Sequence, residues 1–351
     1  MSEETTPAPA PTLYADAGVD IDAGNEAVLR MKEYVRSTFT ENVLADVGAY
    51  GGMFALDKNE VSEPVLVSSI DSVGTKLKIA FLMDRHDTIG RDLVWHCVND
   101  ILVQGARPLF FLDYFATGRL DPAVAADVVK GLAEGCRAVG CALVGGETAE
   151  LPGMYHPGEY DVAGCIVGLV ERGRIIDGRR VSPGDALIGI ASDGLHTNGY
   201  SLARHVLLEK AGFPVDRFFP ELGKTLGEEL LAPHRCYAPA VLPLLAEFDI
   251  HAIAHITGGG FYDNVPRVLP TDCQAIVERR TWQPLPIFGL IQEAGSVPDA
   301  EMFRTFNMGI GMVLIVSAGR AMQIVERLNA SGEDAALIGH VIRGSHEVQI
   351  V

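Results

Sequence analysis

The sequence predicts an α/β (α+β) fold made of two mixed α/β domains. The chain has 351 residues, which exceeds the usual size of a single domain. Apolar residues make up 48% of it and charged residues 21%, a balance typical of a compact globular protein. Strand-like runs alternate with helix-like stripes in two series, and a Ser-Pro-Gly-Asp turn at 182–185 precedes the second. We therefore predict domains at 14–175 and 176–351, after a proline-rich disordered tail at 1–13.

The first series alternates strands and helices. In residues 88–104 apolar side chains recur at helical spacing, and His96, Asn99 and Asp100 lie on the opposite side of that helix. The Asp121-Pro122 pair is typical of a helix start. The predicted elements are strands 64–70, 108–116, 141–145 and 161–171 and helices 88–104 and 122–139.

The second series begins directly after the 182–185 turn. Its apolar runs predict strands at 186–191 and 313–316 and helices at 199–208, 237–247 and 318–329. The second domain is therefore also expected to be mixed α/β.

Charge and cysteine usage exclude several classes of protein. The net charge of -18 predicts that the chain binds neither nucleic acid nor an anionic membrane. The six cysteines form no CxxC pair, which favours buried free thiols. The first residues lack the basic start and apolar stretch of a secretory signal, and no apolar run approaches the roughly 20 residues of a membrane helix. We therefore expect a soluble, cytoplasmic protein.

Three acidic clusters interrupt apolar elements of the first domain. Asp71 follows a strand and precedes a glycine turn and Lys76, which suits a magnesium ion beside a phosphate, or simply a strand leading into a capped helix. Asp100 lies in an apolar helix, where a buried carboxylate needs a partner or a metal. Gly145 and Gly146 precede Glu147, an arrangement that fits a phosphate and a metal or a hairpin turn. The set favours Mg²⁺, a hard cation that prefers oxygen ligands.

Two polar loops of the second domain are candidates for substrate binding. Residues 255–261 carry three consecutive glycines, which indicates either a helix N-terminus able to hold phosphate or a structural turn. Residues 192–200 follow a strand and supply hydroxyl, imidazole and amide groups. By contrast, residues 223–225 resemble the end of a P-loop, but Phe218 stands where the required glycine should be. His86, His156 and His205 are scattered without ligand spacing.

Taken together, the motifs resemble the phosphoribosylformylglycinamidine cyclo-ligase family, also called aminoimidazole ribonucleotide synthetases. The resemblance runs from about Tyr14 to the C-terminus. The motifs that carry it are DAGVDIDAGN, DSVGTK, VNDILVQGARPLFFLDYFATG, LVGGETAELPGMY, SDGLHTNGYSLAR, HAIAHITGGGF and FRTFNMGIGM.

The resemblance implies a homodimer in which the N-terminal sheets of two subunits pair into a barrel, with ATP and Mg²⁺ bound at the N-terminal domain. It implies metal ligands at Asp71, Asp100 and Glu147. Nucleotide contacts are implied at Gly48, Gly51, Gly52, Asp71, Thr75, Lys76, Asn99, Gly145 and Gly146, with Gly48 to Gly52 as a flap. Substrate contacts are expected at His196, Thr197, Asn198, Thr257, Gly258, Gly259 and Gly260, and catalytic roles at Lys76, Asp100, Asn198 and His251.

The implied reaction is ATP-dependent closure of an imidazole ring on a ribosyl phosphate substrate. The γ-phosphoryl group activates the formamide oxygen as a leaving group, and the amidine nitrogen attacks the carbon. His196, His251 and His255 are candidate general bases by residue type alone. Relatives with the same fold act on other acceptors, such as selenide or thiamin phosphate, and a nucleotide-binding regulator without catalysis is a further alternative. The substrate motifs of the second half favour the cyclo-ligase reaction.

Overall fold

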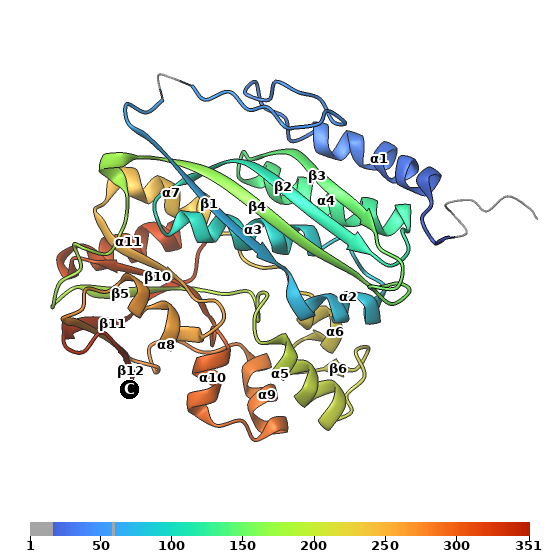
Figure 1. Cartoon of the computed structure of the whole chain (residues 1–351). Helices are drawn as coiled ribbons and strands as arrows, with labels where there is room; N and C mark the ends of the chain where they lie inside the picture. The colour runs from blue at the N-terminus through green and yellow to red at the C-terminus, as the bar shows by residue number, and fades with distance from the viewer. Residues whose placement is uncertain (1–16, 58–59) are drawn as a thin grey trace, which may run out of the picture.

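The computed structural model describes residues 17–57 and 60–351, so the predicted tail at 1–13 and the first residue of the DAGVDIDAGN motif lie outside the described residues. Two separate main sheets confirm the predicted mixed α/β architecture, and residue 175 lies in the link between them (Figure 1). Among the described residues, no helix is both long and apolar enough to cross a membrane.

The first half is built around a four-stranded sheet with the order β1-β4-β2-β3. Strand β2 runs parallel to β3, and the other neighbours are antiparallel. The strands are β1 (Pro64–Ser72), β2 (Arg107–Thr117), β3 (Ala142–Glu150) and β4 (Tyr160–Glu171), and the helices are α1 (Ile21–Arg36), α2 (Leu77–Met83), α3 (Ile89–Leu102) and α4 (Pro122–Ala138). Helices α3 and α4 cover one face of the sheet (Figure 1).

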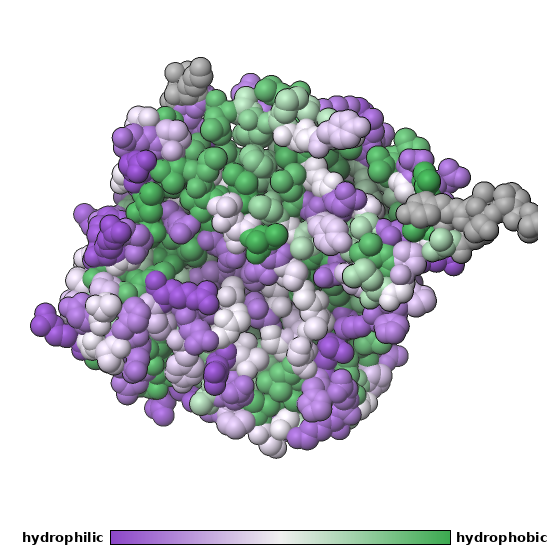
Figure 2. Space-filling view, viewed as in Figure 1, coloured by the Kyte–Doolittle hydropathy of each residue, from purple (hydrophilic) through white to green (hydrophobic). Residues whose placement is uncertain are grey.

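Among the described residues, the other face of this sheet is apolar and largely open, apart from Phe54, whose ring centroid lies 5.4 Å from that of Phe110. Because side chains alternate between faces, the register places Ile70, Cys165, Leu112 and Gly145 in one row across that face. Leu66 and Ile70 are 57% and 73% exposed. In the space-filling view apolar residues gather over this part of the molecule (Figure 2). An uncovered apolar sheet face of this kind is typical of an interaction surface.

The second half is built around a six-stranded sheet with the order β12-β9-β11-β5-β10-β8. Its strands are β5 (Ala186–Ala191), β8 (Ile250–His255), β9 (Cys273–Val277), β10 (Ile310–Val316), β11 (Ala335–Arg343) and β12 (Val348–Ile350), and β6 (Phe218–Phe219) pairs with β7 (Lys224–Thr225) apart from it. Its helices are α5 (Tyr200–Arg204), α6 (Leu226–Leu230), α7 (Ala238–Glu247), α8 (Gly260–Asn264), α9 (Pro286–Gly295), α10 (Asp299–Thr305) and α11 (Ala318–Ala330).

Several element boundaries differ from the sequence prediction. The predicted strand 141–145 continues as β3 to Glu150, because its parallel pairing with β2 runs through both glycines. At Gly146 a Cβ atom would lie 2.3 Å from Asp113 Oδ1, so the sheet needs glycine there for packing. The predicted helix 199–208 ends as a regular α-helix at Arg204 and continues as a π-helical turn over His205–Lys210.

Candidate functional site

Helix α3 carries the polar side chains that connect the two halves. Asn99 Nδ2 donates a hydrogen bond to the Arg235 carbonyl at 2.8 Å, and Asn99 Oδ1 accepts one from the Tyr237 backbone at 3.0 Å. The amide is fully buried. Asn99 therefore fixes α3 to the segment before α7, and its predicted nucleotide contact stays a prediction.

Two carboxylates, Asp71 on β1 and Asp100 on α3, line the same cavity of about 550 Å³. Asp71 Oδ2 lies 2.7 Å from His96 Nε2, and His96 Nδ1 lies 2.7 Å from the Thr197 hydroxyl. Burial disfavours the charged form of His96, but the hydrogen bond to Asp71 and the charges of both carboxylates outweigh it and raise the pKa of His96. Thus two of the three predicted metal ligands, Asp71 and Asp100, line one cavity, and His96 lies between them.

Asp100 is held from both halves of the chain. Its Oδ1 atom accepts a hydrogen bond from His255 Nδ1 at 2.8 Å, and Oδ2 accepts one from the Ser69 hydroxyl at 3.2 Å. Burial alone would raise the pKa of Asp100, yet the hydrogen bonds and the nearby imidazoles lower it overall. The carboxylate is therefore ionised at neutral pH, as a metal ligand must be.

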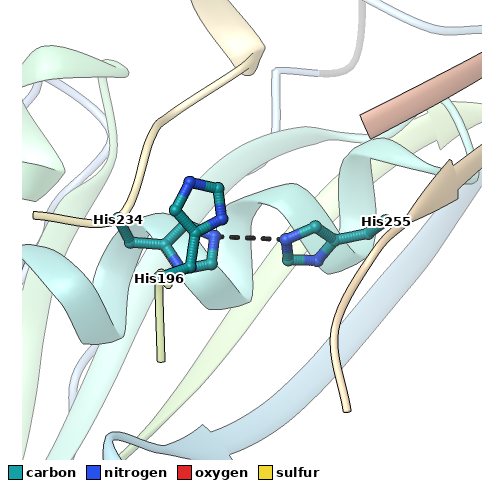
Figure 3. Close-up of side chains that lie close together, drawn as sticks. All are labelled: His196, His234 and His255. Atoms are coloured by element: carbon teal, nitrogen blue, oxygen red, sulfur yellow. Dashed lines mark hydrogen bonds between the residues drawn. The ribbon is translucent and has the colours of Figure 1, made fainter. Parts of the chain in front are cut away.

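His255, the hydrogen-bond partner of Asp100, forms a buried cluster of imidazoles with His196 and His234 (Figure 3). His234 Nε2 and His255 Nε2 are 3.1 Å apart, and the rings of His196 and His234 lie with their centroids 4.0 Å apart. Burial lowers the pKa of all three histidines, so they are neutral at pH 7. His196 also adopts a left-handed backbone conformation, with φ of 64°.

Lys76 is buried at the junction of the two halves. Its amine is fully buried, 2.8 Å from Asp92, and donates a hydrogen bond to the Ala232 carbonyl at 2.7 Å. Asp92 also accepts a hydrogen bond from the His234 backbone at 2.6 Å. The lysine therefore joins the two halves of the chain, and its predicted phosphate contact stays a prediction.

Glu147 and His251 lie apart from this cavity. Strands β1 and β3 form opposite edges of the sheet. Asp71 and Gly146, which stand at the two ends of one row across it, are therefore separated by three strand spacings, about 14 Å. Glu147 also points to the open face, opposite to Asp71. His251 Nδ1 lies 2.8 Å from Asp185 on the second sheet. A single chain thus brings neither residue to Asp71 and Asp100.

The predicted flap contacts the β3 edge of the sheet. Gly48, with φ of 99°, and Gly51 have open space where a Cβ atom would stand, whereas a Cβ on Gly52 would lie 2.8 Å from Val144 Cγ2. Gly52 is therefore next to the Gly145-Gly146 pair. The predicted nucleotide contacts thus divide into two groups, one along β3 and the other beside Asp71, where the Thr75 hydroxyl contacts that of Ser201.

The two predicted substrate loops meet each other. A Cβ on Gly258 would lie 3.2 Å from Asn198 Oδ1, and Thr257 lines the same cavity as Asp71 and Asp100. The prediction of a helix N-terminus after the glycines is confirmed, since α8 begins at Gly260 with Gly259 in left-handed conformation as its cap.

Sequence reasoning missed three residues of this region. His96 had a usable signal, because it stands four residues before Asp100 on the same side of α3. His234 comes from an irregular segment with no pattern in the sequence. Arg267 also lines the cavity of Asp71 and Asp100, and among the described residues it makes no ion pair. It is the one arginine or lysine of that cavity wall in the described part of the chain.

Two family models match the two halves of the chain. Residues 56–170 match the family model of the AIR synthase related protein, N-terminal domain, and residues 182–351 match the C-terminal domain model. The chain is 56% identical over 330 residues to the phosphoribosylformylglycinamidine cyclo-ligase of Citrifermentans bemidjiense, covering 94% of this chain and 95% of that protein. The enzyme of the same name from Geobacter sulfurreducens is 55% identical over 341 residues, covering 96% and 98%.

Solved structures show the same fold at low sequence identity. Thiamine-monophosphate kinase from Stenotrophomonas maltophilia superposes with a TM-score of 0.68 at 15% identity, covering 93% of this chain and 95% of that one. Escherichia coli HypE, a hydrogenase maturation protein, gives 0.67 at 18% identity, covering 93% of each chain. With sequence similarity to the cyclo-ligases over nearly its whole length, this chain belongs to the phosphoribosylformylglycinamidine cyclo-ligase family.

Proposed function

We propose that this chain catalyses the ATP-dependent ring closure of formylglycinamidine ribonucleotide to 5-aminoimidazole ribonucleotide, with release of ADP and phosphate. The observation that carries the proposal is the 52 to 56% identity to cyclo-ligases over nearly the full length of both chains. The activity belongs to purine biosynthesis and makes the protein a carbon–nitrogen ligase. A cytoplasmic location and the lack of nucleic-acid binding stay predictions.

The cavity at the junction has opposite charges on its walls, which suits the two ends of this substrate. Asp71 and Asp100 lie on one wall, and Arg267 lies on the wall formed after α8. A guanidinium binds phosphate oxygens through two parallel hydrogen bonds. We therefore place the ribose 5′-phosphate at Arg267 and the formamide near Asp100, with Thr257 between them.

Asp71 and Asp100 are the residues that would hold Mg²⁺. Their side chains are 39% and 27% exposed toward the cavity, and the Ser69 hydroxyl adds a third oxygen. An all-oxygen donor set of this kind fits a hard cation. When bound, the ion would neutralise charge on the ATP phosphates.

The remaining steps need positioning by the chain and one proton acceptor. The γ-phosphoryl group passes to the formamide oxygen, which turns that oxygen into a phosphate leaving group. The amidine nitrogen then attacks the carbon, loses a proton and displaces phosphate, closing the ring. The site contributes by aligning the oxygen with the γ-phosphorus and by stabilising the charge that develops. His255 lines the cavity and is hydrogen-bonded to Asp100, whereas His251 is paired with Asp185 outside it, so His255 is a better candidate for the base than His251.

We further propose that the active form is a homodimer joined through the open face of the four-stranded sheet. This pairing would bury the row containing Ile70 and Leu112 and close the two sheets into a barrel. It would also explain the division of the nucleotide contacts, since Gly52, Gly145 and Glu147 of one subunit could complete the Asp71–Asp100 site of the other. The homodimer therefore keeps Glu147 as a candidate metal ligand.

Steady-state assays with alternative acceptors test this proposal. The purified full chain is assayed for ADP release with formylglycinamidine ribonucleotide or thiamin monophosphate, with Mg²⁺ or with a chelator. We expect release only with the ribonucleotide and Mg²⁺. Release with the other acceptor would instead favour a related phosphoryl-transfer enzyme.

A further inference from the structure

We propose that His196, His234 and His255 form a binding site for a transition-metal ion of the Zn²⁺ class, separate from the Mg²⁺ site. Each residue offers one nitrogen, and these nitrogens lie within 4.8 Å of one another. All three side chains are buried. They come from the loop after β5, the segment before α7, and the end of β8 (Figure 3). One ion would thus tie three separate segments together.

The spacing of the rings fits tetrahedral coordination. Zinc binds imidazole nitrogen at about 2.0 to 2.1 Å, so two nitrogens on one tetrahedral ion are roughly 3.4 Å apart. His234 Nε2 and His255 Nε2 are 3.1 Å apart in this structure. The ion would replace the proton that these two nitrogens share, with a small outward movement of the rings.

His255 already has the second contact that a ligand histidine requires. Its Nδ1 donates a hydrogen bond to Asp100, which leaves the lone pair of Nε2 directed at His234. A carboxylate behind the far nitrogen is the arrangement found around most histidine-bound metals, because it fixes the tautomer and the ring orientation.

The other two rings have nitrogens without partners. The Nδ1 atoms of His196 and His234 are buried and make no hydrogen bond. An unsatisfied buried polar atom is costly, and it needs an explanation in a packed interior. An ion held by Nε2 of His234 and Nε2 of His255 would replace the hydrogen bond between them. The unpartnered Nδ1 of His196 offers the third donor, whereas His196 Nε2 already accepts backbone hydrogen bonds from Asp193 and Arg235 at 3.4 Å.

The donor type separates this site from the Mg²⁺ site. Three imidazoles favour Zn²⁺, Co²⁺ or Ni²⁺, whereas Mg²⁺ prefers oxygen. A competing set, His96, Asp100 and His255, has the same compactness but uses one carboxylate. His96 already contacts Asp71 through Nε2 and Thr197 through Nδ1, so an ion bound through either nitrogen would break one of these contacts.

The test uses the full chain without any affinity tag and Co²⁺ as the probe, followed by Zn²⁺ competition. We expect one Co²⁺ per chain with the strong visible absorption of tetrahedral coordination, displaced by Zn²⁺. His234→Gln should weaken Co²⁺ binding at least about tenfold. His96→Gln tests the competing set, and the exposed His205→Gln is the matched control; both should bind within about twofold of the wild type.

Circular dichroism of each variant without metal shows whether it folds, and His196→Asn replaces His234→Gln if that variant does not. Absence of saturable Co²⁺ binding would overturn the proposal. So would unchanged affinity in the folded His234→Gln or His196→Asn variant, or a loss confined to His96→Gln. Because the measurement is binding, its outcome is independent of whether the chain closes an imidazole ring.

Discussion

His255 of the second sheet donates a hydrogen bond to Asp100 of helix α3, with 2.8 Å between Nδ1 and Oδ1. The two residues are 155 positions apart in the sequence, and their contact sets the carboxylate at the junction of the two halves. A carboxylate that is already held by a hydrogen bond would need little reorganisation to bind a cation beside a nucleotide. This is the principle of electrostatic preorganisation.

Asp100→Asn should abolish turnover while the fold is kept. The amide oxygen can still accept the hydrogen bond from His255, but the negative charge that the metal needs is gone. We expect kcat to fall on the order of 100-fold or more, with a melting temperature close to that of the wild type. Asp177→Asn, on the wall of the same cavity, is the matched control and should stay active. Full activity of Asp100→Asn would remove this residue from the site.

Lys76→Met should destabilise the protein rather than impair phosphate binding. The substitution leaves Asp92 buried without its cation, and breaking a buried ion pair costs about 3 to 5 kcal/mol. Denaturant unfolding measures the loss, and adding Asp92→Asn should restore part of it. The exposed Lys210→Met serves as control. Normal stability combined with a raised KM for ATP would show that Lys76 does contact phosphate.

Arg267→Ala should weaken binding of the ribonucleotide selectively. The side chain is exposed to the cavity and would supply the cation for the 5′-phosphate. Charge-assisted hydrogen bonds contribute about 1.5 to 3 kcal/mol, so we expect the KM for this substrate to rise about 10- to 100-fold with the KM for ATP unchanged. Arg320→Ala on α11 is the control. A rise in the KM for ATP alone would place the nucleotide at Arg267 instead.

Ile70→Asp should give a folded monomer without activity. The side chain is 73% exposed in the single chain, so one subunit tolerates the charge, but a barrel interface would not. Light scattering after size exclusion measures the mass, and Met322→Asp on α11, 57% exposed, is the matched control. A dimeric, active Ile70→Asp protein would argue against pairing through this face.

The sequence was informative where local pattern decides the structure. The stripe of α3, the strand before Asp71 and the helix start after three glycines all follow from periodicity and glycine placement, and the structure contains each of them. Asp71 and Asp100 could be predicted to lie close together because each carboxylate interrupts an apolar element, and both line one cavity.

Local sequence patterns could not predict the contacts between segments that are distant in the sequence. Lys76 stands in a motif that suits phosphate, yet Asp92 and Ala232, which enclose it, come from other parts of the chain. His251 and His255 are equivalent by residue type. Only strand register and packing decide that His251 contacts Asp185 and that His255 contacts Asp100. The distance of Glu147 from Asp71 depends on the order of the strands in the sheet, because β3 lies at the edge opposite β1.

The most direct test of the account measures ADP and aminoimidazole product together in one reaction of the full chain with formylglycinamidine ribonucleotide, ATP and Mg²⁺. If this site closes the ring, both appear at equal stoichiometry and both disappear in Asp100→Asn. ADP released without the aminoimidazole, or neither product despite bound ATP, would contradict the assignment of ring closure to this site.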